Sequence, residues 1–389
     1  MSSALDHALL TRTTAQAREH TTRSSPPTTV PVIEAIATGS PSLVLDQSVA
    51  AEWMAGQFTD RQQQERIRRI FRNTMIDTRR FAVDPLDARI HAPNGAAATI
   101  QDRMRLFYRH AVPLAVDVAR RALDGVDPAD VGLLVFATST GVIAPGVDVA
   151  VVENLGLPRS VARLVVNFMG CAAAMNGIRA ASDFVLANPG KKAMVLCIEL
   201  NSVQAVPVDD FNDAVIGSLF GDGCGAVVIG ANRGGERAEA GTIVIRDRFT
   251  HLFEATEDGI VVGVNHDGIT CELSENVPRY IYNGVAPVVG DVLRRNGLRQ
   301  SDIDAWAIHP GGPKILLESA RSLGLPPEAS STSWKVLAEY GNMSSVSLIF
   351  VLERIAAQTG ADKPVSTGIA FSFAPGVTIE GFVFDLVRR

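Results

Sequence analysis

Short apolar segments alternate along the chain with longer segments of helical periodicity. Branched and apolar residues concentrate in five segments that we expect to be strands, at 30–39, 131–140, 162–170, 192–200 and 225–231. Helical patterns are predicted for the segments 47–72, 103–125 and 171–190. Because strands that alternate with helices usually form a sheet covered on both faces, the pattern predicts an α/β fold.

The unit of strand, glycine-containing turn and helix occurs twice. Segment 304–320 resembles segment 132–150, and segment 339–358 resembles segment 167–186. Repetition of a whole supersecondary unit is the mark of a duplicated architecture. We therefore expect two similar α/β halves.

The spacing of four residues supports this duplication. Thr138 and His309 are 171 positions apart, and so are Cys171 and Asn342, so two strand-end positions keep one offset. The glycine- and charge-rich stretch near Gly234–Glu236 is the expected boundary. The predicted division is a flexible N-terminal tail at 1–29, an N-terminal half at 30–235 with the cysteine, and a C-terminal half at 236–389 with the histidine and asparagine.

Composition limits the classes of protein that fit. The 389 residues are 47% hydrophobic and 20% charged, as expected for a globular enzyme of two domains or two fused halves. A net charge of −6 does not indicate the overall positive charge that is typical of nucleic-acid-binding proteins. No apolar run approaches the roughly 18 residues of a membrane span, and the first 29 residues lack the apolar core of a secretory signal. Four widely spaced cysteines fit neither a zinc site nor a disulfide framework. We expect a cytoplasmic protein without a bound metal.

Cys171 is the candidate nucleophile. It follows Met169 and Gly170 at the end of a predicted strand and opens a predicted helix, where the helix dipole and free N–H groups favour a thiolate. A sharp turn between strand and helix also lifts a side chain clear of the sheet. The alternative is a small buried cysteine that fills a seam, which is the interpretation we favour, from residue type alone, for the other cysteines: Cys197, Cys224 and Cys271.

His309 and Asn342 are the candidate partners. His309 ends a buried strand before Pro-Gly-Gly-Pro, at the edge where α/β sites form, although a lone histidine there is often structural. The amide of Asn342 can donate to a developing oxyanion, although asparagine after glycine is also a good helix N-cap. Because the repeat places Cys171 and Asn342 at equivalent positions, we expect these side chains to face one cavity.

At these residues the chain resembles a known family, the type III polyketide synthases, which are the chalcone synthase-like branch of the thiolase-fold condensing enzymes. The resemblance covers nearly all of 30–389 and rests on NFMGCAAA at 167–174, SLFGDGCGAVVIG at 218–230, WAIHPGGPKIL at 306–316, YGNMSSVS at 340–347 and FAPGVTIEG at 373–381. Within the family, GITCELSEN and VVNFMGCAAAMN are most similar to actinobacterial alkylpyrone synthases, notably those of mycobacteria. The resemblance implies a thiolase-like fold with layers in the order αβαβα.

The resemblance also implies a mechanism. Cys171 would take an acyl group from acyl-CoA as a thioester, and His309 and Asn342 would stabilise the enolate that forms when malonyl-CoA loses CO₂. Repeated condensation and cyclisation would give an alkylpyrone-type product. Backbone N–H groups at Cys171 and Ala374 would form the oxyanion hole, and no cofactor beyond the CoA thioesters is needed.

Further residues acquire roles only through the resemblance. Phe220 matches one gatekeeper phenylalanine, whereas the second gatekeeper position holds Cys271. The substrate pocket would also include several polar residues, namely Ser139, Thr140, Asn201, Gln204 and Ser344. An aromatic gate replaced by Cys271 leaves more space, and we therefore expect a medium- or long-chain aliphatic starter rather than a flavonoid-type one.

Binding of CoA and self-association are also implied. Arg66 and Arg69 match positions that bind CoA phosphates, and guanidinium groups suit phosphate, although a basic helix is more often a solvated face. Gly311 and Gly312 would border the path of the pantetheine arm of CoA. The stretch 143–146 matches the family's dimer interface, so a homodimer is expected.

Three alternatives stay open at this point. One is a ketoacyl synthase III-like enzyme that performs a single condensation. Another is a thioesterase, in which water captures the acyl group. The third is a non-catalytic thiolase-like subunit, which the joint presence of Cys171, His309 and Asn342 disfavours.

Overall fold

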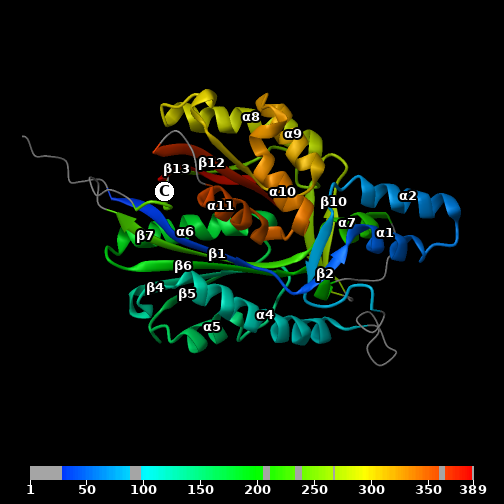
Figure 1. Ribbon diagram of the computed structural model, residues 1–389, viewed down its shortest axis with the longest axis horizontal. Helices are drawn as coiled ribbons and strands as arrows, with labels where there is room; N and C mark the ends of the chain where they lie inside the picture. Colours follow the sequence, from blue (N-terminus) through cyan, green and yellow to red (C-terminus); the bar gives the residue numbers. More distant parts are fainter. Residues whose placement is uncertain are drawn as a thin grey trace, which may run out of the picture.

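The computed structural model describes residues 29–87, 98–204, 211–232, 239–265, 268–358 and 364–387. Figure 1 shows five layers, with α4 (Ile100–Ala122) and α5 (Val147–Leu155) at one outer face. The opposite outer face is formed by α8 (Val277–Arg295) and α9 (Pro313–Leu323). Two further helices lie between the two parts of the sheet, α6 (Ala173–Ala187) and α11 (Ser347–Ala357). The expected order αβαβα is therefore observed.

Nine strands form the main sheet in the order β11-β12-β13-β8-β1-β7-β6-β4-β5. The first half contributes β1 (Val30–Gly39), β4 (Val131–Ala137), β5 (Ala162–Val166), β6 (Lys192–Leu200) and β7 (Asp222–Asn232). The second half contributes β8 (Ile243–Leu252), β11 (Ala305–Ile308), β12 (Val365–Ala374) and β13 (Thr378–Val387). Strand β1 pairs with β7 along its whole length but with β8 only at Val32 and Ile33, so the two parts of the sheet join over a short contact.

The central layer is the largest region of buried apolar contact. Side chains of α6 and α11 pack together with strands of both halves, whereas α4 and α5 cover only the first half and α8 and α9 only the second. Alternation of side chains along each strand explains this arrangement, because Val135 faces the central helices and Phe136 faces α4 and α5. Both central helices begin from short 3-10 turns, η3 (Gly170–Ala172) and η7 (Ser344–Val346).

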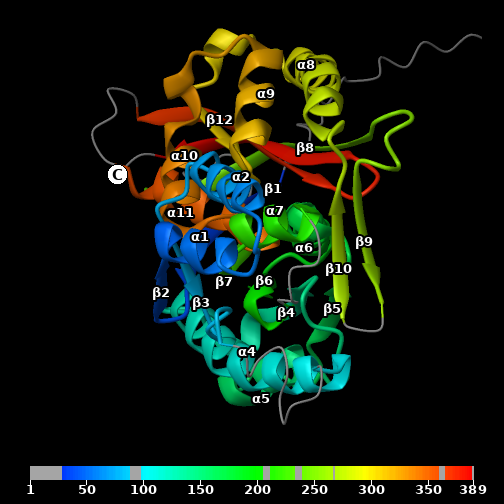
Figure 2. The same cartoon turned by 90° about the vertical axis from the view of Figure 1, so that its right-hand side faces the viewer.

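Smaller elements gather at one end of the molecule (Figures 1 and 2). They comprise the helices α1 (Gln47–Ala55), α2 (Arg61–Arg72), α7 (Phe211–Leu219) and α10 (Ser331–Tyr340). Two small antiparallel sheets join them, β2 (Leu43–Asp46) with β3 (Thr78–Phe81) and β9 (Ile260–Val264) with β10 (Ile269–Leu273). This end contains the cavity described below.

Most predicted elements are observed within a few residues of their expected bounds, but the helix expected at 47–72 is two helices. Gly56 ends α1, and the side chain of Asp60 caps α2 by accepting from Gln62 N and Gln63 N. The expected tail up to residue 28 and the boundary at 235/236 lie outside the described residues. No helix in the described parts of the chain is long and apolar enough to cross a membrane.

Candidate active site

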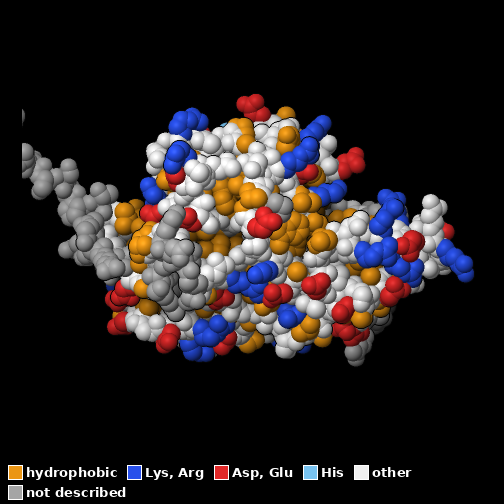
Figure 3. All heavy atoms as spheres, turned by 45° about the horizontal axis from the view of Figure 1, so that its top comes forward, with side chains coloured by type: hydrophobic (Ala, Val, Ile, Leu, Met, Phe, Trp, Pro, Cys, Tyr) orange, Lys and Arg blue, Asp and Glu red, His pale blue; other side chains and the backbone are white. Residues whose placement is uncertain are grey.

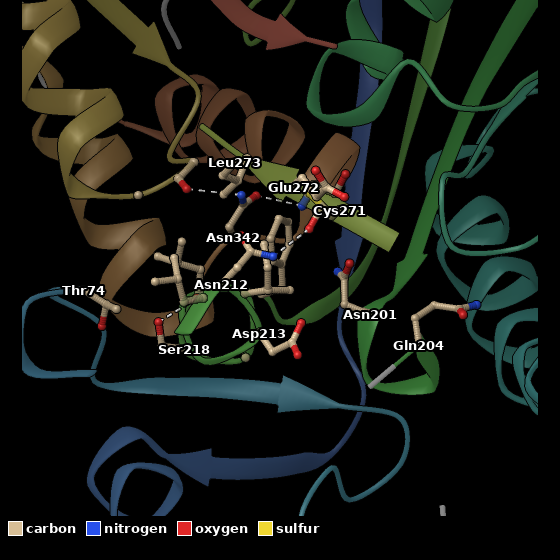
Figure 4. A pocket seen from close by; sticks show the side chains of 18 of the residues that line it. Thr74, Asn201, Gln204, Asn212, Asp213, Ser218, Cys271, Glu272, Leu273 and Asn342 are labelled. Atoms are coloured by element: carbon tan, nitrogen blue, oxygen red, sulfur yellow. Dashed lines mark hydrogen bonds between the residues drawn. The ribbon is translucent and has the colours of Figure 1, made fainter. Parts of the chain in front are cut away.

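A cavity of about 1470 Å³ lies at the end of the molecule where the smaller elements gather. It is lined by residues of both halves, and the three candidate catalytic residues, Cys171, His309 and Asn342, all contribute to its wall. Figure 4 shows its polar lining, with Asn201 and Gln204 on one side and Cys271 and Asn342 on another. Its volume exceeds the 300–1,000 Å³ of common small-molecule sites, which leaves room for a long substrate.

Cys171 lies in the η3 turn rather than in the first turn of α6 itself. Gly170 before it has φ 51°, and a Cβ at that glycine would lie 3.2 Å from Pro375 Cδ. The Cys171 carbonyl accepts from Ser372 Oγ at 2.8 Å, which ties the turn to β12. The left-handed glycine thus turns the chain sharply between β5 and α6, and the thiol faces the cavity.

Asn342 is held beside the thiol in a fixed orientation. Its Oδ1 accepts from Ser344 N at 2.8 Å, and its Nδ2 donates to Gly311 O at 3.2 Å. Both amide atoms lie 3.9 Å from Cys171 Sγ, as does Ser344 Oγ. These bonds fix the amide face that a substrate oxygen would meet.

His309 follows β11 and is only 2% exposed. Its backbone N–H donates to Phe371 O at 3.0 Å, but neither ring nitrogen has a hydrogen-bond partner among the described residues. A Cβ at Gly311 would lie 3.1 Å from His309 Nε2. Glycine at that position therefore keeps the space beside the ring nitrogen open, and the two unpaired nitrogens are available to a bound substrate.

Burial disfavours a charge on either Cys171 or His309. It raises the pKa of the Cys171 thiol to about 12, opposed by hydrogen bonds from Ser344 and Asn342, and lowers the pKa of His309 to about 3. Both shifts favour the uncharged form of the side chain concerned. Desolvation in the cavity wall therefore opposes the expected thiolate, and the protonation state of Cys171 stays a prediction.

The predicted substrate-pocket residues all line the cavity: Ser139, Thr140, Asn201, Gln204, Phe220, Cys271 and Ser344. Gln204 Nε2 donates to Thr140 O at 2.7 Å, whereas Gln204 Oε1 and Ser139 Oγ are buried without a partner among the described residues. Cys197 and Cys224 are fully buried as expected, but Cys271 is partly exposed in the cavity wall, as its gatekeeper position implies.

The predicted CoA-binding residues separate into two groups. Gly311 and Gly312 line the cavity. Arg66 and Arg69 are exposed on α2 and do not line it, although Asn73 and Thr74 at the end of that helix do. Of the two expected oxyanion-hole positions, Cys171 lines the cavity, and Ala374 is buried at the end of β12 and does not. The roles of these residues stay predictions.

Several buried charged residues near the site are absent from the expectations above, and two of them, Glu199 and Arg79, matter below. Glu199 ends β6 and accepts hydrogen bonds from Ser139 N, Thr140 Oγ1 and Ser345 Oγ at 2.9, 2.9 and 2.6 Å, and burial raises its pKa to about 7. Arg79, on β3, is 3% exposed. The sequence contained a sign of this role for Glu199, because it is a charged residue inside an otherwise apolar predicted strand.

Comparison with known proteins identifies the family. The model of the chalcone and stilbene synthase N-terminal domain matches residues 18–233, and the model of the C-terminal domain matches residues 248–388. The chain therefore belongs to the chalcone and stilbene synthase family, the type III polyketide synthases, and its fold is thiolase-like as expected.

Individual relatives agree with this assignment. The chain is 60% identical over 367 residues to the alpha-pyrone synthesis polyketide synthase-like Pks18 of Mycobacterium tuberculosis, covering 94% of this chain and 93% of that protein. It is 33% identical to the 1,3,6,8-tetrahydroxynaphthalene synthase of Streptomyces peucetius subsp. caesius, covering 71% and 72% of the two chains. The crystal structure of PKS-I from the brown alga Ectocarpus siliculosus has a TM-score of 0.84 and 39% identity, covering 92% of this chain and 99% of that one. The alternatives of a single-condensation enzyme and of a non-catalytic subunit receive no support.

Proposed function

We propose that this enzyme condenses malonyl-CoA units onto an acyl group carried by Cys171 and cyclises the extended chain to an α-pyrone. The observation that carries the proposal is the convergence of Cys171, Asn342 and His309 on one cavity, from two different halves of the chain. The α-pyrone follows from the printed name of the 60% identical relative.

The first step is acyl transfer from acyl-CoA to Cys171. His309 takes the thiol proton as general base, the sulfur attacks the thioester carbonyl, and CoA leaves as the thiol with the proton returned by His309. Transfer of the proton from Cys171 to His309 leaves the combined charge of the two side chains at zero. The buried site can therefore form the thiolate during the acyl-transfer step itself. The Cys171 N–H lies at the turn where the tetrahedral oxyanion would form, with Ala374 N–H as the proposed second donor.

The second step is formation of the nucleophilic carbon. The malonyl carboxylate leaves as CO₂, and its bonding electron pair becomes an enolate on the malonyl thioester. Asn342 Nδ2 and a protonated ring nitrogen of His309 donate to the enolate oxygen, because neither has a competing charged partner. The enolate carbon then attacks the Cys171 acyl carbonyl and expels the sulfur, and the lengthened chain reloads for another cycle. No cofactor takes part in this scheme, since loss of CO₂ drives the condensation.

A medium- or long-chain aliphatic starter is proposed for this site. The cavity is large, and its wall includes apolar side chains on α1, α2 and α7, among them Trp53, Ile70 and Val215. Cys271 at a gate position occupies less space than an aromatic side chain. Gly311 and Gly312 would border the pantetheine arm, and Arg66 and Arg69 would meet the phosphates of CoA outside the cavity.

A homodimer in the cytoplasm is proposed as the working form. Strand β5 is at the edge of the main sheet with exposed Leu164 and Val165, and the neighbouring loop exposes Val142 and Ile143. Asn167, directly after β5, donates from Nδ2 to Gly141 O at 3.2 Å, so this loop begins beside the end of β5. An exposed apolar sheet edge favours pairing with a second copy. Four free cysteines favour a reducing compartment.

The test is mass spectrometry of the products that purified protein makes from malonyl-CoA and a series of acyl-CoA starters, from acetyl to long-chain fatty acyl. α-Pyrones that carry the starter chain, absent with Cys171→Ala, are expected. Release of free acid without extension would identify a thioesterase, and a single extension would identify a ketoacyl synthase III-like enzyme. Failure to decarboxylate malonyl-CoA would refute the roles of His309 and Asn342.

A further inference from the structure

The C-terminal end of α7 lies at the cavity and is held by donors from other parts of the chain. Gly217 O and Phe220 O accept from Arg79 Nη1 at 2.7 and 2.8 Å. Ser218 O accepts from Gln47 Nε2 at 2.7 Å. The last carbonyls of a helix have no partner within the helix, so these bonds determine where the end of α7 and the following residues lie.

Arg79 is the centre of this arrangement. It is 3% exposed, and its Nε donates to Gln47 Oε1 at 3.0 Å, so it also orients the amide that holds Ser218 O. Burial lowers the pKa of Arg79 to about 9, opposed by the charge of Asp222, and the side chain is therefore still cationic at neutral pH. A guanidinium can serve two carbonyls and an amide at once in a fixed fork, which a lysine cannot do. A positive charge also suits the negative end of a helix dipole.

The segment that carries Asn342 is joined to this helix end. Asn342 N donates to Leu219 O at 2.9 Å, Gly221 N donates to Asn342 O at 3.0 Å, and Phe220 and Asn342 form an isolated parallel bridge. Gly341, which has φ 68°, lies against the aliphatic part of Arg79, because a Cβ there would be 2.9 Å from both Arg79 Cγ and Cδ. Arg79 thus contacts the chain next to Phe220 and the chain next to Asn342.

Cys171 is placed by other contacts. Its turn is fixed by the left-handed Gly170, by Pro375 and by the bond from Ser372 Oγ to the Cys171 carbonyl. Within the described residues, Arg79 forms no hydrogen bond with this turn. The side chains of Cys171 and Asn342 meet at 3.9 Å, but the turn that carries Cys171 and the chain that carries Phe220 and Asn342 are held by different bonds.

We propose that Arg79 is a positioning residue for the malonyl-CoA half of the reaction, which keeps Phe220 and Asn342 in register without setting the position of Cys171. This inference rests on the proposed function, since it needs the enolate-forming role of Asn342. It predicts that the two half-reactions respond differently to the loss of one buried side chain.

The experiment compares wild-type protein with Arg79→Met and Arg79→Lys in two separate assays. Acylation of Cys171 is followed by intact-protein mass after mixing with a long-chain acyl-CoA alone. Decarboxylation is followed as acetyl-CoA formed from malonyl-CoA alone, with each rate normalised to folded protein. Arg79→Met is expected to lower decarboxylation about 10- to 100-fold, as for a displacement of about 1 Å in a reacting group, and to leave acylation unchanged. Arg79→Lys is expected to recover part of the loss, because an ammonium still reaches the α7 carbonyls but lacks the fork to Gln47.

Arg248→Met is the matched control, because Arg248 also donates to a helix carbonyl, Arg179 O at 3.2 Å, and is remote from the cavity wall. Its decarboxylation-to-acylation ratio should equal that of wild type. An equal fall of both half-reactions in the Arg79 variants, or no fall in either, would overturn the positioning role while the proposed function stands. A wild-type enzyme that acylates Cys171 but releases no acetyl-CoA would instead refute the proposed function and this inference with it. If Arg79→Met does not fold, Arg79→Lys decides between these outcomes.

Discussion

The turns before α6 and α11 occupy equivalent places in the two halves, yet they present different chemical groups to the cavity. Gly170 and Gly341 both have positive φ, and each precedes a residue whose side chain faces the cavity. In the first half that residue is Cys171, with a thiol that can form a covalent bond. In the second half it is Asn342, with an amide that can only donate and accept. Under the proposed function, a duplicated backbone thus supplies one nucleophile and one set of hydrogen-bond donors to a single site, and neither half is complete alone.

The strongest test of this difference between the two turns is to change the chemistry of the Asn342 side chain without changing its shape. Asn342→Asp replaces the Nδ2 donor by an oxygen and adds a charge beside Cys171 Sγ. Malonyl-CoA decarboxylation should fall about 10²- to 10³-fold, as for removal of one oxyanion donor. The readout is acetyl-CoA released per folded enzyme. Cys171→Ala is the opposite control, since it removes acylation but keeps the donors; a fall in decarboxylation as large as that of Asn342→Asp would refute the division of labour.

The two glycines should differ in what they tolerate. Gly341 has φ 68° and ψ −161°, a region open almost only to glycine, and a Cβ there would lie 2.7 Å from Leu219 O. Gly341→Ala should therefore cost about 3–5 kcal/mol of unfolding free energy. Gly170→Ala meets only Pro375 Cδ at 3.2 Å and should cost about 1–2 kcal/mol.

Denaturant unfolding of both variants at one pH measures this difference. Gly290→Ala serves as a third variant, because nothing lies within 4 Å of a Cβ at that helical glycine. It should be neutral or stabilising. A larger cost for Gly170→Ala than for Gly341→Ala would contradict the geometry.

Glu199 lies at the contact of the two halves and gives a pH-dependent test. Its pKa is about 7 in the folded chain against an ordinary 4.5, because burial disfavours the carboxylate. Between these pH values the unfolded chain releases a proton that the folded chain keeps, so stability is full below about 4.5 and falls by about 3 kcal/mol as pH rises to 7. Glu199→Gln lacks this titration, and its Tm should improve relative to wild type between pH 5 and pH 8.

Asp222 provides the control for that measurement. Burial also raises its pKa, to about 6, and it accepts from Ser202 N at 2.9 Å and Ala82 N at 2.7 Å. Asp222→Asn should show the same trend at lower pH. A Tm difference between wild type and Glu199→Gln that stays constant with pH would show that Glu199 does not titrate in this range.

The smallest effect is expected at the two gate positions, Phe220 from the first half and Cys271 from the second. Cys271→Phe adds an aromatic ring to the cavity wall and should shift starter use toward shorter acyl chains, with decarboxylation nearly unchanged. The measurement is a competition between short- and long-chain acyl-CoA in one reaction. Mass spectrometry of the products gives the ratio of short-chain to long-chain starter use. An unchanged ratio would show that the chain passes elsewhere in the cavity.

The sequence alone predicted the parts of the molecule that follow from periodicity and repetition. Strands 30–39 and 192–200 are observed as β1 and β6, and the shared offset of 171 positions brought Cys171 and Asn342 together. Arg79 could not be assigned a role, because its importance depends on carbonyls of α7 that lie 138 and 141 positions away. The burial that raises the pKa of Cys171 could not be predicted for the same reason, since burial is created by tertiary packing.

The wall that carries Cys271 has a consequence for how this scaffold can change. Strands β9 and β10 pair with each other, and in the described part of the chain with no other strand. Substitutions on the cavity side of this hairpin can therefore change the wall without breaking a strand pair of the nine-stranded sheet, although Gly376 N donates to Ile260 O at 3.3 Å and ties the hairpin to the turn after β12. The hairpin is thus the part of the cavity wall where the shape of the substrate space can change with the least change to the proposed reacting groups.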